Sequence, residues 1–373
     1  MNAGLYIHIP FCKSRCSYCD FATDVYRNKD AVERYVSALC GEISDFKVQN
    51  SGLFDTLYFG GGTPSLLTAK QLEKILDTIH RKFEFANNLS FTLEMNPGTV
   101  TLDKLLDFRK LGVNRASFGV QTFDDKALKL LARGHDSNDA RTTFKLLRKA
   151  KFDNISFDLI GGLPNQTMAN WEDNLNQALD LEPEHLSLYL LELEDSTPLA
   201  EQIRSNRQPQ PDEELAAEMY ELMLDKVATK GFEQYEISNF SKPGFQSRHN
   251  NKYWNCDSVF GFGVSAHSFD GKVRWSNERD TNKYVSMIEN GDSTIVAREE
   301  INLASEFSFL GLRKNQGLNL REYQARFGID LKTKFASELE SLSVEGLIIF
   351  ENEYLKLTRK GMVFSNEVFS VFV

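Results

Sequence analysis

Six short apolar runs, regularly spaced over the first half of the chain, restrict the fold more than any other feature of this sequence. They are residues 5–9, 56–59, 90–93, 115–118, 155–160 and 185–191. Amphipathic helical patterns fill the intervals, and one of them starts at a capping box over residues 68–71. Strands alternating with helices are typical of a parallel sheet or barrel. Because six units are fewer than the eight of a closed barrel, we predict an α/β fold with a partial (β/α)6 barrel, open on one side for a bulky substrate.

Three cysteines, Cys12, Cys16 and Cys19, follow the first apolar run in the spacing C-x3-C-x2-C. This segment reaches at most roughly 25 Å when fully extended, so the three thiolates are expected to curl around one metal or cluster. No fourth Cys or His stands at zinc-finger spacing, and three thiols cannot all pair as disulfides. The pattern therefore predicts a four-iron cluster with one iron left open. Three structural cysteines are the alternative, and Cys40 and Cys256 are interpreted as packing residues.

Polar and glycine-rich segments follow four of the other apolar runs. They are residues 60–64, with the sequence Gly-Gly-Gly-Thr-Pro, residues 94–97, residues 119–121, and Asp158 with the segment 161–164. Ligands of parallel sheets bind at the carboxyl ends of the strands, where these segments are expected to meet. Consecutive glycines also let a ligand approach the backbone amides closely.

In this order, the motifs resemble the radical S-adenosylmethionine (SAM) superfamily and, more narrowly, the oxygen-independent coproporphyrinogen III oxidase family, as far as about residue 280. The resemblance implies a radical SAM barrel in which the three cysteines bind a [4Fe-4S] cluster and SAM chelates the open iron. It further implies SAM contacts from Tyr6, Tyr18, Gly61, Gly62, Thr63, Glu94, Gln121, Arg133 and Asp158. Glu94 and Asp158 can accept hydrogen bonds from ribose or amino groups, and Arg133 can pair with the methionyl carboxylate. For any single position, an ordinary polar residue is the alternative.

Two branches of this family differ at features that can be read here. The cysteine pattern of the oxidase branch is C-x3-C-x2-C-x-C, whereas Phe21 stands here at the position of the last cysteine. In addition, the first strand begins near residue 5, without the long preceding segment of that branch. Both departures resemble the haem-chaperone branch, which implies haem binding and transfer to an acceptor protein without coproporphyrinogen oxidase activity. A radical SAM oxidoreductase acting on a tetrapyrrole, such as a coproporphyrinogen oxidase, is the alternative function.

The segment His-Asn-x-x-Tyr-Trp at residues 249–254 is similar to the haem-associated motif of the chaperone branch. A neutral imidazole is a good axial ligand of haem iron, and Tyr253 and Trp254 could wall in a flat macrocycle, so His249 is the candidate haem ligand. Alternatively, His249 only orders its neighbours. His8 alternates with two isoleucines and is expected to form hydrogen bonds inside the barrel or near the cluster.

The C-terminal part of the chain carries a different pattern. After a break over residues 204–211, Asp212 is predicted to cap a helix that ends by Gly231. Beyond about residue 300, two helices and a hairpin of residues 347–350 and 354–357 resemble a winged helix. The predicted domains are therefore the barrel, residues 1–205, an α+β extension, residues 206–300, and a winged-helix-like domain, residues 301–373.

Charge and hydropathy limit the partners and the compartment. The formal net charge of −10 argues against a nucleic-acid partner, including a tRNA substrate, and residues 307–373 carry nine Lys or Arg against eight Asp or Glu. No apolar stretch spans a bilayer and no secretory signal is evident, so we expect a cytoplasmic protein. The expected partners are haem, a haem acceptor, an electron donor such as a flavodoxin or ferredoxin, and transiently a membrane protein. The sequence leaves open which acceptor and donor these are, whether SAM is cleaved, whether haem is covalent, and the oligomeric state.

Overall fold

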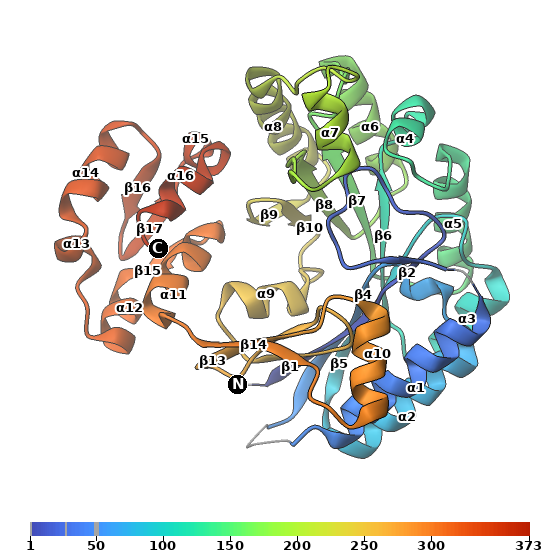
Figure 1. Cartoon of the computed structure of the whole chain (residues 1–373). Coiled ribbons are helices and arrows are strands. Elements are labelled where there is room, and N and C mark those ends of the chain that lie inside the picture. Colours follow the sequence, from blue (N-terminus) through green and yellow to red (C-terminus); the bar gives the residue numbers. More distant parts are fainter. Residues whose placement is uncertain (1, 27, 48–51) are drawn as a thin grey trace.

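The core of the protein is one curved sheet that carries the six predicted strands in parallel. The computed structural model describes residues 2–26, 28–47 and 52–373. The six strands are β1 (Ala3–Ile9), β4 (Phe54–Gly61), β5 (Phe85–Met95), β6 (Arg115–Gln121), β7 (Ile155–Gly161) and β8 (His185–Leu190). They lie side by side in that order, so the partial (β/α)6 barrel is confirmed (Figure 1).

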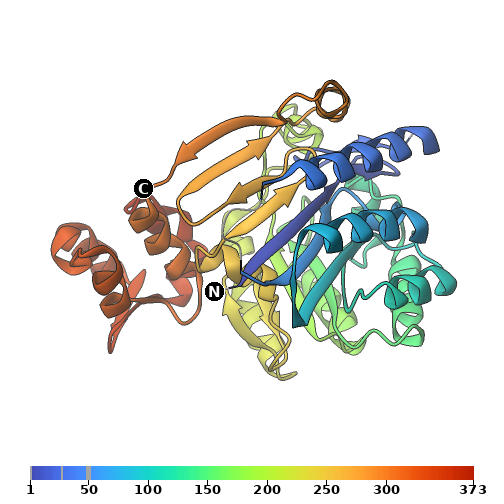
Figure 2. The same cartoon turned by 90° about the horizontal axis from the view of Figure 1, so that it is seen from below.

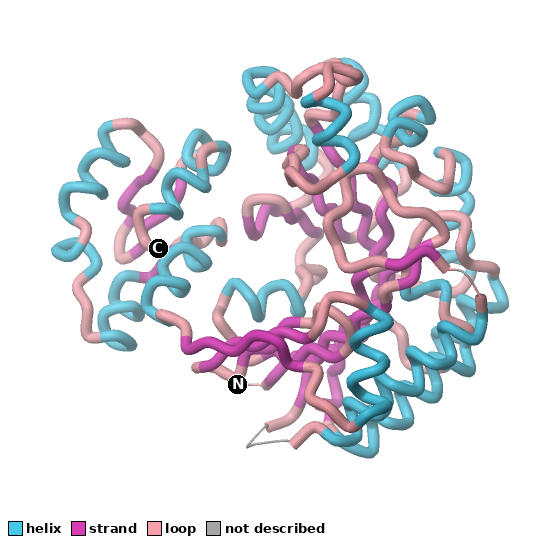
Figure 3. The backbone as a smooth tube through the Cα atoms, in the orientation of Figure 1, coloured by secondary structure: helices cyan, strands magenta, loops and turns pink. Residues whose placement is uncertain are grey.

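Helices cover the outer face of this sheet (Figure 3). They are α1 (Lys29–Asp45), α2 (Ala69–Lys82), α3 (Leu102–Lys110), α4 (Asp125–Leu130), α5 (Ser137–Lys149) and α6 (Met168–Asp180), and a short 3-10 turn, η1 (Pro64–Leu66), precedes α2. The predicted capping box is confirmed, because the side chains of Thr68 and Gln71 each accept a hydrogen bond from the other's backbone NH. Such caps fix where each helix begins and therefore where the loop before it meets the strand ends.

The two faces of the sheet differ in chemistry. The outward side chains, such as Ile7, Phe59 and Phe157, are apolar and fully buried against the helices. Each contributes about 1.5–3 kcal/mol by leaving water. The inward side chains are mostly polar, as the register row Tyr6, Tyr58, Thr92 and Arg115 illustrates. A closed barrel of this kind packs its interior with branched apolar residues, so a polar inner face indicates an interior that receives a ligand.

Residues 206–300 extend both edges of the same sheet. After α8 (Glu213–Ala228), β9 (Glu233–Glu236) and β10 (Asn239–Ser241) add to β8. On the other edge, β11 (Val259–Phe262) pairs in parallel with β1, and β12 (His267–Phe269), β13 (Val273–Asn277) and β14 (Ile295–Glu300) follow antiparallel (Figure 2). Between these additions lies α9 (Arg248–Trp254), and α10 (Thr281–Asn290) joins β13 to β14. Asp212 caps α8 as predicted. The limits between the three predicted domains stay predictions.

A partly buried carboxylate, Glu42 of α1, forms several of the contacts between the barrel and the extension. It accepts hydrogen bonds from the backbone NH of Gly263 at 2.8 Å and the hydroxyl of Tyr284 at 2.6 Å. Asn277 and Thr294 donate to its other oxygen. Because this one side chain joins α1 to elements on β13, α10 and β14, it fixes the added strands against the barrel.

The last part of the chain forms a compact body beside the open side of the sheet (Figure 1). Its elements are α11 (Leu303–Arg313), β15 (Leu318–Asn319), α12 (Leu320–Phe327), α13 (Leu331–Lys334), α14 (Ala336–Val344), β16 (Ile348–Glu351), β17 (Tyr354–Leu357), α15 (Arg359–Val363) and α16 (Ser365–Ser370). The strand order β15-β17-β16 and the predicted hairpin are those of a winged helix. Arg313 attaches this body to the sheet by an ion pair with buried Glu236 at 2.8 Å. No helix of the described residues is long and apolar enough to cross a membrane.

Candidate functional site

The three cysteines lie in the loop that follows β1. Cys12 ends β2 (Phe11–Cys12), which pairs with β3 (Asp24–Val25) and closes the loop at its base. The backbone NH of Tyr26 donates to the carbonyl of Cys12 at 2.7 Å. All three thiols are free and partly exposed. The loop therefore presents three unpaired thiols together at the carboxyl ends of the parallel strands.

Two side chains from the predicted SAM set donate hydrogen bonds to these sulfurs. The hydroxyl of Thr63 donates to Sγ of Cys12 at 3.4 Å, and Nη1 of Arg133 donates to Sγ of Cys16 at 3.4 Å. Burial raises the pKa of Cys12 to about 11 and also raises the pKa of Cys19. Donated hydrogen bonds and the adjacent guanidinium counteract this effect, because they favour the charged thiolate that binds iron.

The chemistry of this donor set fits a [4Fe-4S] cluster. Within residues 2–26, 28–47 and 52–373, no group of three or more His, Cys, Asp or Glu side chains is arranged to hold a single metal ion. The thiolates of a cubane bind three different irons and so lie farther apart than the ligands of one ion. Three free thiols in one loop, two of them with hydrogen bonds donated to their sulfurs, are consistent with a [4Fe-4S] cluster.

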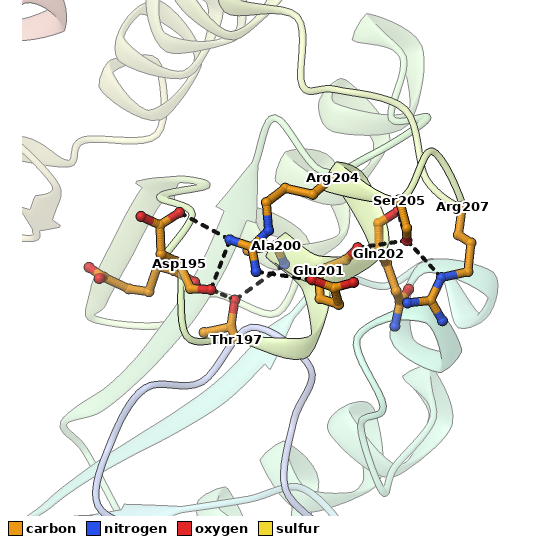
Figure 4. A network of polar contacts seen from close by, with 9 residues as sticks. Asp195, Thr197, Ala200, Glu201, Gln202, Arg204, Ser205 and Arg207 are labelled. Carbon is orange, nitrogen blue, oxygen red and sulfur yellow. Dashed lines mark hydrogen bonds and ion pairs between the residues drawn. The ribbon is translucent and has the colours of Figure 1, made fainter.

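A second loop holds the cysteine loop in place. The backbone NH of Leu199 donates to the carbonyl of Ser17 at 2.8 Å, and the hydroxyl of Ser196 donates to Asp20 at 2.8 Å. Leu199 belongs to α7 (Pro198–Arg204), whose own ends are fixed by polar contacts (Figure 4). In that network Arg204 donates to the carbonyl of Asp195 at 3.0 Å and pairs with Glu201 at 3.1 Å. The segment before the predicted break therefore supports the cysteine loop, and the break itself begins with a turn in which the NH groups of Ser205 and Arg207 donate to carbonyls of α7.

Arg133 connects the cysteine loop to the strand ends. Besides Cys16, its guanidinium donates to the carbonyl of Gly119 at 2.6 Å, to Asn96 at 3.0 Å and to the hydroxyl of Tyr18 at 3.3 Å. Tyr18 packs on an apolar cluster that includes Leu131, Ile160, Leu163, Leu199 and Ile203. The structure therefore brings the predicted residues Arg133 and Tyr18 together with a cysteine, and it adds Asn96, which the sequence analysis did not single out.

Glu94 and Asp158 are the two inward carboxylates of the candidate SAM site. The hydroxyl of Tyr58 donates to Glu94 at 2.6 Å and the backbone NH of Gly61 donates to it at 3.1 Å. Burial raises the pKa of Glu94 to about 7 despite these bonds. Burial also raises the pKa of Asp158, which a hydrogen bond from Ser187 opposes. Two carboxylates held in a low-dielectric interior are well suited to accept hydrogen bonds from a hydroxyl or amino ligand.

The glycine run at the end of β4 has a steric cause. Gly61 has φ +105°, and a Cβ there would lie 2.5 Å from the ring of His8. A Cβ on Gly62 would lie 2.7 Å from the backbone of Pro10. His8 itself forms hydrogen bonds inside the barrel, to the carbonyl of Ala22 at 2.9 Å and to Tyr6 at 3.1 Å, as predicted. The glycines are therefore needed for the loop to pass β1, in addition to their predicted contact with SAM.

Gln121 ends β6 in an unusual conformation. Its φ is +66°, in the left-handed region that non-glycine residues rarely adopt. A Cβ on Gly119 would lie 2.5 Å from the side-chain nitrogen of Gln121, so the amide folds back over the strand end. Strained backbone at a strand end is a feature of ligand sites, and it agrees with the predicted role of Gln121.

His249 lies in the wall of the barrel interior, in α9, and only 3% of its surface is exposed. Nδ1 is 2.9 Å from the hydroxyl of Thr56, and Nε2 is 3.3 Å from the hydroxyl of Tyr253. The ring stacks on Tyr58 with centroids 4.9 Å apart and on Tyr6 at 6.4 Å. Burial lowers the pKa of His249 to about 3, so the imidazole is neutral at physiological pH. Its haem contact stays a prediction.

The other two residues of the motif have different surroundings. Tyr253 keeps 39% of its surface exposed, although burial strongly raises the pKa of its hydroxyl, a combination expected for a side chain lining a concave surface. Trp254 lies under the guanidinium of Arg313, 4.5 Å from the ring centroid, and so joins α9 to the winged-helix-like body. Tyr253 is therefore partly exposed, whereas Trp254 has a structural contact.

Sequence reasoning also missed a row of buried polar side chains that joins β7, β8 and β9. The hydroxyl of Ser156 lies 2.8 Å from Nδ1 of His185, whose Nε2 lies 2.8 Å from the hydroxyl of Tyr235. Ser156 and His185 precede apolar residues in their strands, which was a weak signal, whereas Tyr235 stands between Gln234 and Glu236 and gave none. These hydrogen-bonded side chains show that the inner face of the sheet stays polar far from the cysteines.

Comparison with known proteins places this site in a family. The profile described as "Radical SAM superfamily" matches residues 6–178, and the one described as "HemN C-terminal domain" matches residues 299–364. A Bacillus subtilis protein named "Heme chaperone HemW" is 39% identical over 376 residues, which cover 99% of this chain and 98% of that protein. The chain belongs to the HemW family of radical SAM proteins.

Other relatives of this HemW-family chain include a Bos taurus protein named "Radical S-adenosyl methionine domain-containing protein 1, mitochondrial". It is 31% identical over 375 residues, covering 97% of this chain and 85% of that protein. Among solved structures, the coproporphyrinogen III oxidase HemN of Escherichia coli superposes with a TM-score of 0.86 at 22% identity, over 100% of this chain and 90% of that one. That likeness confirms the radical SAM fold and its C-terminal extension. Radical SAM membership implies a [4Fe-4S] cluster and SAM for the HemW-family site.

Proposed function

We propose that this HemW-family protein is a haem chaperone, which binds haem and transfers it to an acceptor protein. The support is the near full-length similarity to proteins named "Heme chaperone HemW", together with one observation at the cluster loop. Phe21, at the position of the fourth cysteine in the oxidase pattern, is 67% exposed and cannot ligate a metal. The site therefore lacks a feature of the coproporphyrinogen oxidases.

The proposed haem contact is Nε2 of His249. In the tautomer in which Nδ1 donates to Thr56, Nε2 carries the lone pair and its only contact is the long 3.3 Å bond to Tyr253. A hydrogen bond at Nδ1 orients an imidazole toward iron and fixes its tautomer. Iron would have to displace the Tyr253 hydroxyl, a small cost because that hydroxyl belongs to a partly exposed ring.

The proposed cofactor site lies at the opposite end of the strands. Cys12, Cys16 and Cys19 would hold a [4Fe-4S] cluster, which when bound supplies one-electron chemistry and an open iron for SAM. Of the nine predicted SAM contacts, Thr63 and Arg133 would act on the sulfur side, and Glu94 and Asp158 would accept hydrogen bonds. A cytoplasmic location, an electron donor of the flavodoxin or ferredoxin type, an acceptor protein and a transient membrane-protein contact belong to the same proposal.

A radical SAM oxidoreductase acting on a tetrapyrrole is the second candidate. Glu94 on the inner face favours this candidate. Its pKa is raised to about 7, so its carboxyl group can hold or release a proton near neutral pH. A protein that only carries haem has no need of such a group. The two candidates share one barrel and differ in whether a product forms.

The deciding experiment uses the protein with its cluster reconstituted anaerobically. Haem is titrated into the wild type and His249→Ala while the Soret band is followed, and the wild type is then assayed for coproporphyrinogen decarboxylation with SAM and a reductant. A stoichiometric haem complex without decarboxylation supports the chaperone, and loss of the band in His249→Ala supports His249 as ligand. Product formation without a stable haem complex would instead establish the oxidoreductase.

A further inference from the structure

Arg115 is a buried cation on the inner face of the barrel that the protein leaves without a partner. Only 3% of its surface is exposed. It begins β6, whose next outward residues, Ala116 and Phe118, are fully buried against the helices, so Arg115 and Ser117 point inward. Among the described residues, its guanidinium makes no hydrogen bond or ion pair, and its Nε is buried without an acceptor.

This lack of a partner is unusual, because burying an unpaired charge costs several kcal/mol. The two nearby carboxylates are already engaged, Glu94 by Tyr58 and the NH of Gly61, and Asp158 by Ser187. Neither lies within ion-pair distance of Arg115. The guanidinium therefore has its full capacity for hydrogen bonding, including a planar fork that matches a carboxylate.

The register places Arg115 in the same row as the aromatic stack of the proposed haem site. Tyr6, Tyr58, Thr92 and Arg115 are paired in sequence across β1, β4, β5 and β6. His249 stacks on two of these tyrosines. An aromatic wall, a neutral imidazole and an unpartnered guanidinium thus face one interior from adjacent positions.

We propose that Arg115 binds a propionate carboxylate of a tetrapyrrole that enters this interior. The proposal rests on the proposed function and names the substrate group that the barrel recognises. SAM also carries a carboxylate, but at the cluster that group would lie at the carboxyl ends of the strands. Arg115 and Gln121 are the two ends of a seven-residue strand, a separation of about 20 Å. Arg133, not Arg115, is within reach of the cluster end.

The test compares ligands that differ only in the carboxylate. Iron protoporphyrin IX and its dimethyl ester are titrated into the reconstituted wild type, Arg115→Gln and Arg115→Lys, by Soret absorbance. A charged bidentate hydrogen bond corresponds to about tenfold to hundredfold in affinity. The wild type should prefer the free acid by at least tenfold, Arg115→Gln should bind both compounds like the wild-type ester complex, and Arg115→Lys should keep part of the preference.

Arg321→Gln is the matched control, since it removes an arginine that is 80% exposed and remote from the inner face. It should keep the full preference for the acid. SAM binding, measured in parallel, should be unchanged in Arg115→Gln. Loss of SAM affinity with unchanged haem affinity would overturn the proposal in favour of the SAM carboxylate. Equal weakening of acid and ester together with a lower melting temperature would overturn it in favour of a structural role.

Metal-free coproporphyrin III and its tetramethyl ester, followed by quenching of tyrosine fluorescence, separate this proposal from the chaperone function. If the wild type binds no haem yet prefers the free coproporphyrin in an Arg115-dependent way, the chaperone function fails and the carboxylate site stands. If haem binds but Arg115→Gln keeps the preference for the acid, the chaperone stands and the carboxylate site fails. If neither porphyrin binds, both fail.

Discussion

The carboxyl and amino ends of the barrel strands treat their arginines differently. Arg133, at the carboxyl ends, donates hydrogen bonds to Cys16, Tyr18, Asn96 and the carbonyl of Gly119, whereas Arg115, at the amino end of β6, has no partner among the described residues. Arg133 is held in place by its contacts with the cysteine loop, whereas the guanidinium of Arg115 keeps its hydrogen-bonding capacity unused. The comparison supports our proposal that the barrel has a cofactor end and a separate ligand end.

The largest effect is expected at the cofactor end from Cys16→Ala. Removing one of three thiolates should abolish the cluster, because no other described cysteine lies in that loop to replace it. Iron and acid-labile sulfide per chain after anaerobic reconstitution measure this. Cys40→Ser, on α1, is the control and should keep full iron content. Full iron content in Cys16→Ala would show that the cluster is held elsewhere.

The next largest effect should come from Arg133→Met, the counterpart of the Arg115 variants. It removes four donated hydrogen bonds, so SAM affinity should fall about tenfold to hundredfold and the melting temperature should drop. Calorimetric titration with SAM and thermal unfolding measure the two effects, with Arg321→Met as control. If stability fell while SAM affinity held, Arg133 would be a structural residue and the contrast between the two ends would weaken.

The stability contributions of His249 and Glu94 should also depend on pH with opposite signs. At the ligand end, burial lowers the pKa of His249 to about 3, so the unfolded chain binds its proton more readily. The stability due to neutral His249 is complete above pH about 6.5 and is lost as pH falls toward 3, by about 1.4 kcal/mol per pH unit at most. At the cofactor end, the pKa of Glu94 is raised to about 7, so its contribution is complete below pH about 4.5 and is lost as pH rises through 7.

Urea unfolding of His249→Asn and Glu94→Gln across this range measures the difference. His249→Asn should have a shallower acid slope, but not a flat one, because burial also lowers the pKa of His8 and His135 to about 4. Glu94→Gln should have a shallower decline between pH 4.5 and 7, but not a flat one, because burial also raises the pKa of Glu42 to about 7. If the dependence of the unfolding free energy on pH were unchanged in both variants, burial would not shift the pKa of either His249 or Glu94.

The smallest effect is expected from Phe21→Cys, which restores the cysteine of the oxidase pattern. Because Phe21 is largely exposed, the substitution should change the unfolding free energy by no more than about 0.5 kcal/mol and leave iron content and haem affinity unchanged. Coproporphyrinogen decarboxylation by this variant would show that a single position separates the two functions.

Local signals predicted most of the fold. Apolar alternation located all six parallel strands, and side-chain caps such as Thr68 and Asp212 located helix starts. Both signals depend on neighbours within a few residues. The pairing of the extension's strands with the edges of the barrel sheet was not predicted, since β11 reaches β1 only through contacts between residues about 250 positions apart, such as Gly4 and Val259.

The site divides in the same way. Spacing alone indicated the cysteine triad, because thiolates close in sequence are expected to share one cluster. The strand-end motifs indicated Thr63 and Glu94, and the family resemblance implied Arg133. No local pattern distinguishes Arg115 from an ordinary arginine at the start of a strand. Its lack of a partner depends on which groups the strands from β4 to β8 bring around it, and only the tertiary structure determines that.

The sequence by itself therefore determined which polar segments follow which strands, where the cluster loop lies, and the family resemblance. All three depend on spacing over short stretches of the chain. The tertiary structure decided that His249 faces the barrel interior, that Trp254 holds the winged-helix-like body and that Arg115 stays unpaired. The physical reason is that burial, hydrogen-bond satisfaction and electrostatic partners depend on contacts between residues far apart in the chain, which no local pattern encodes.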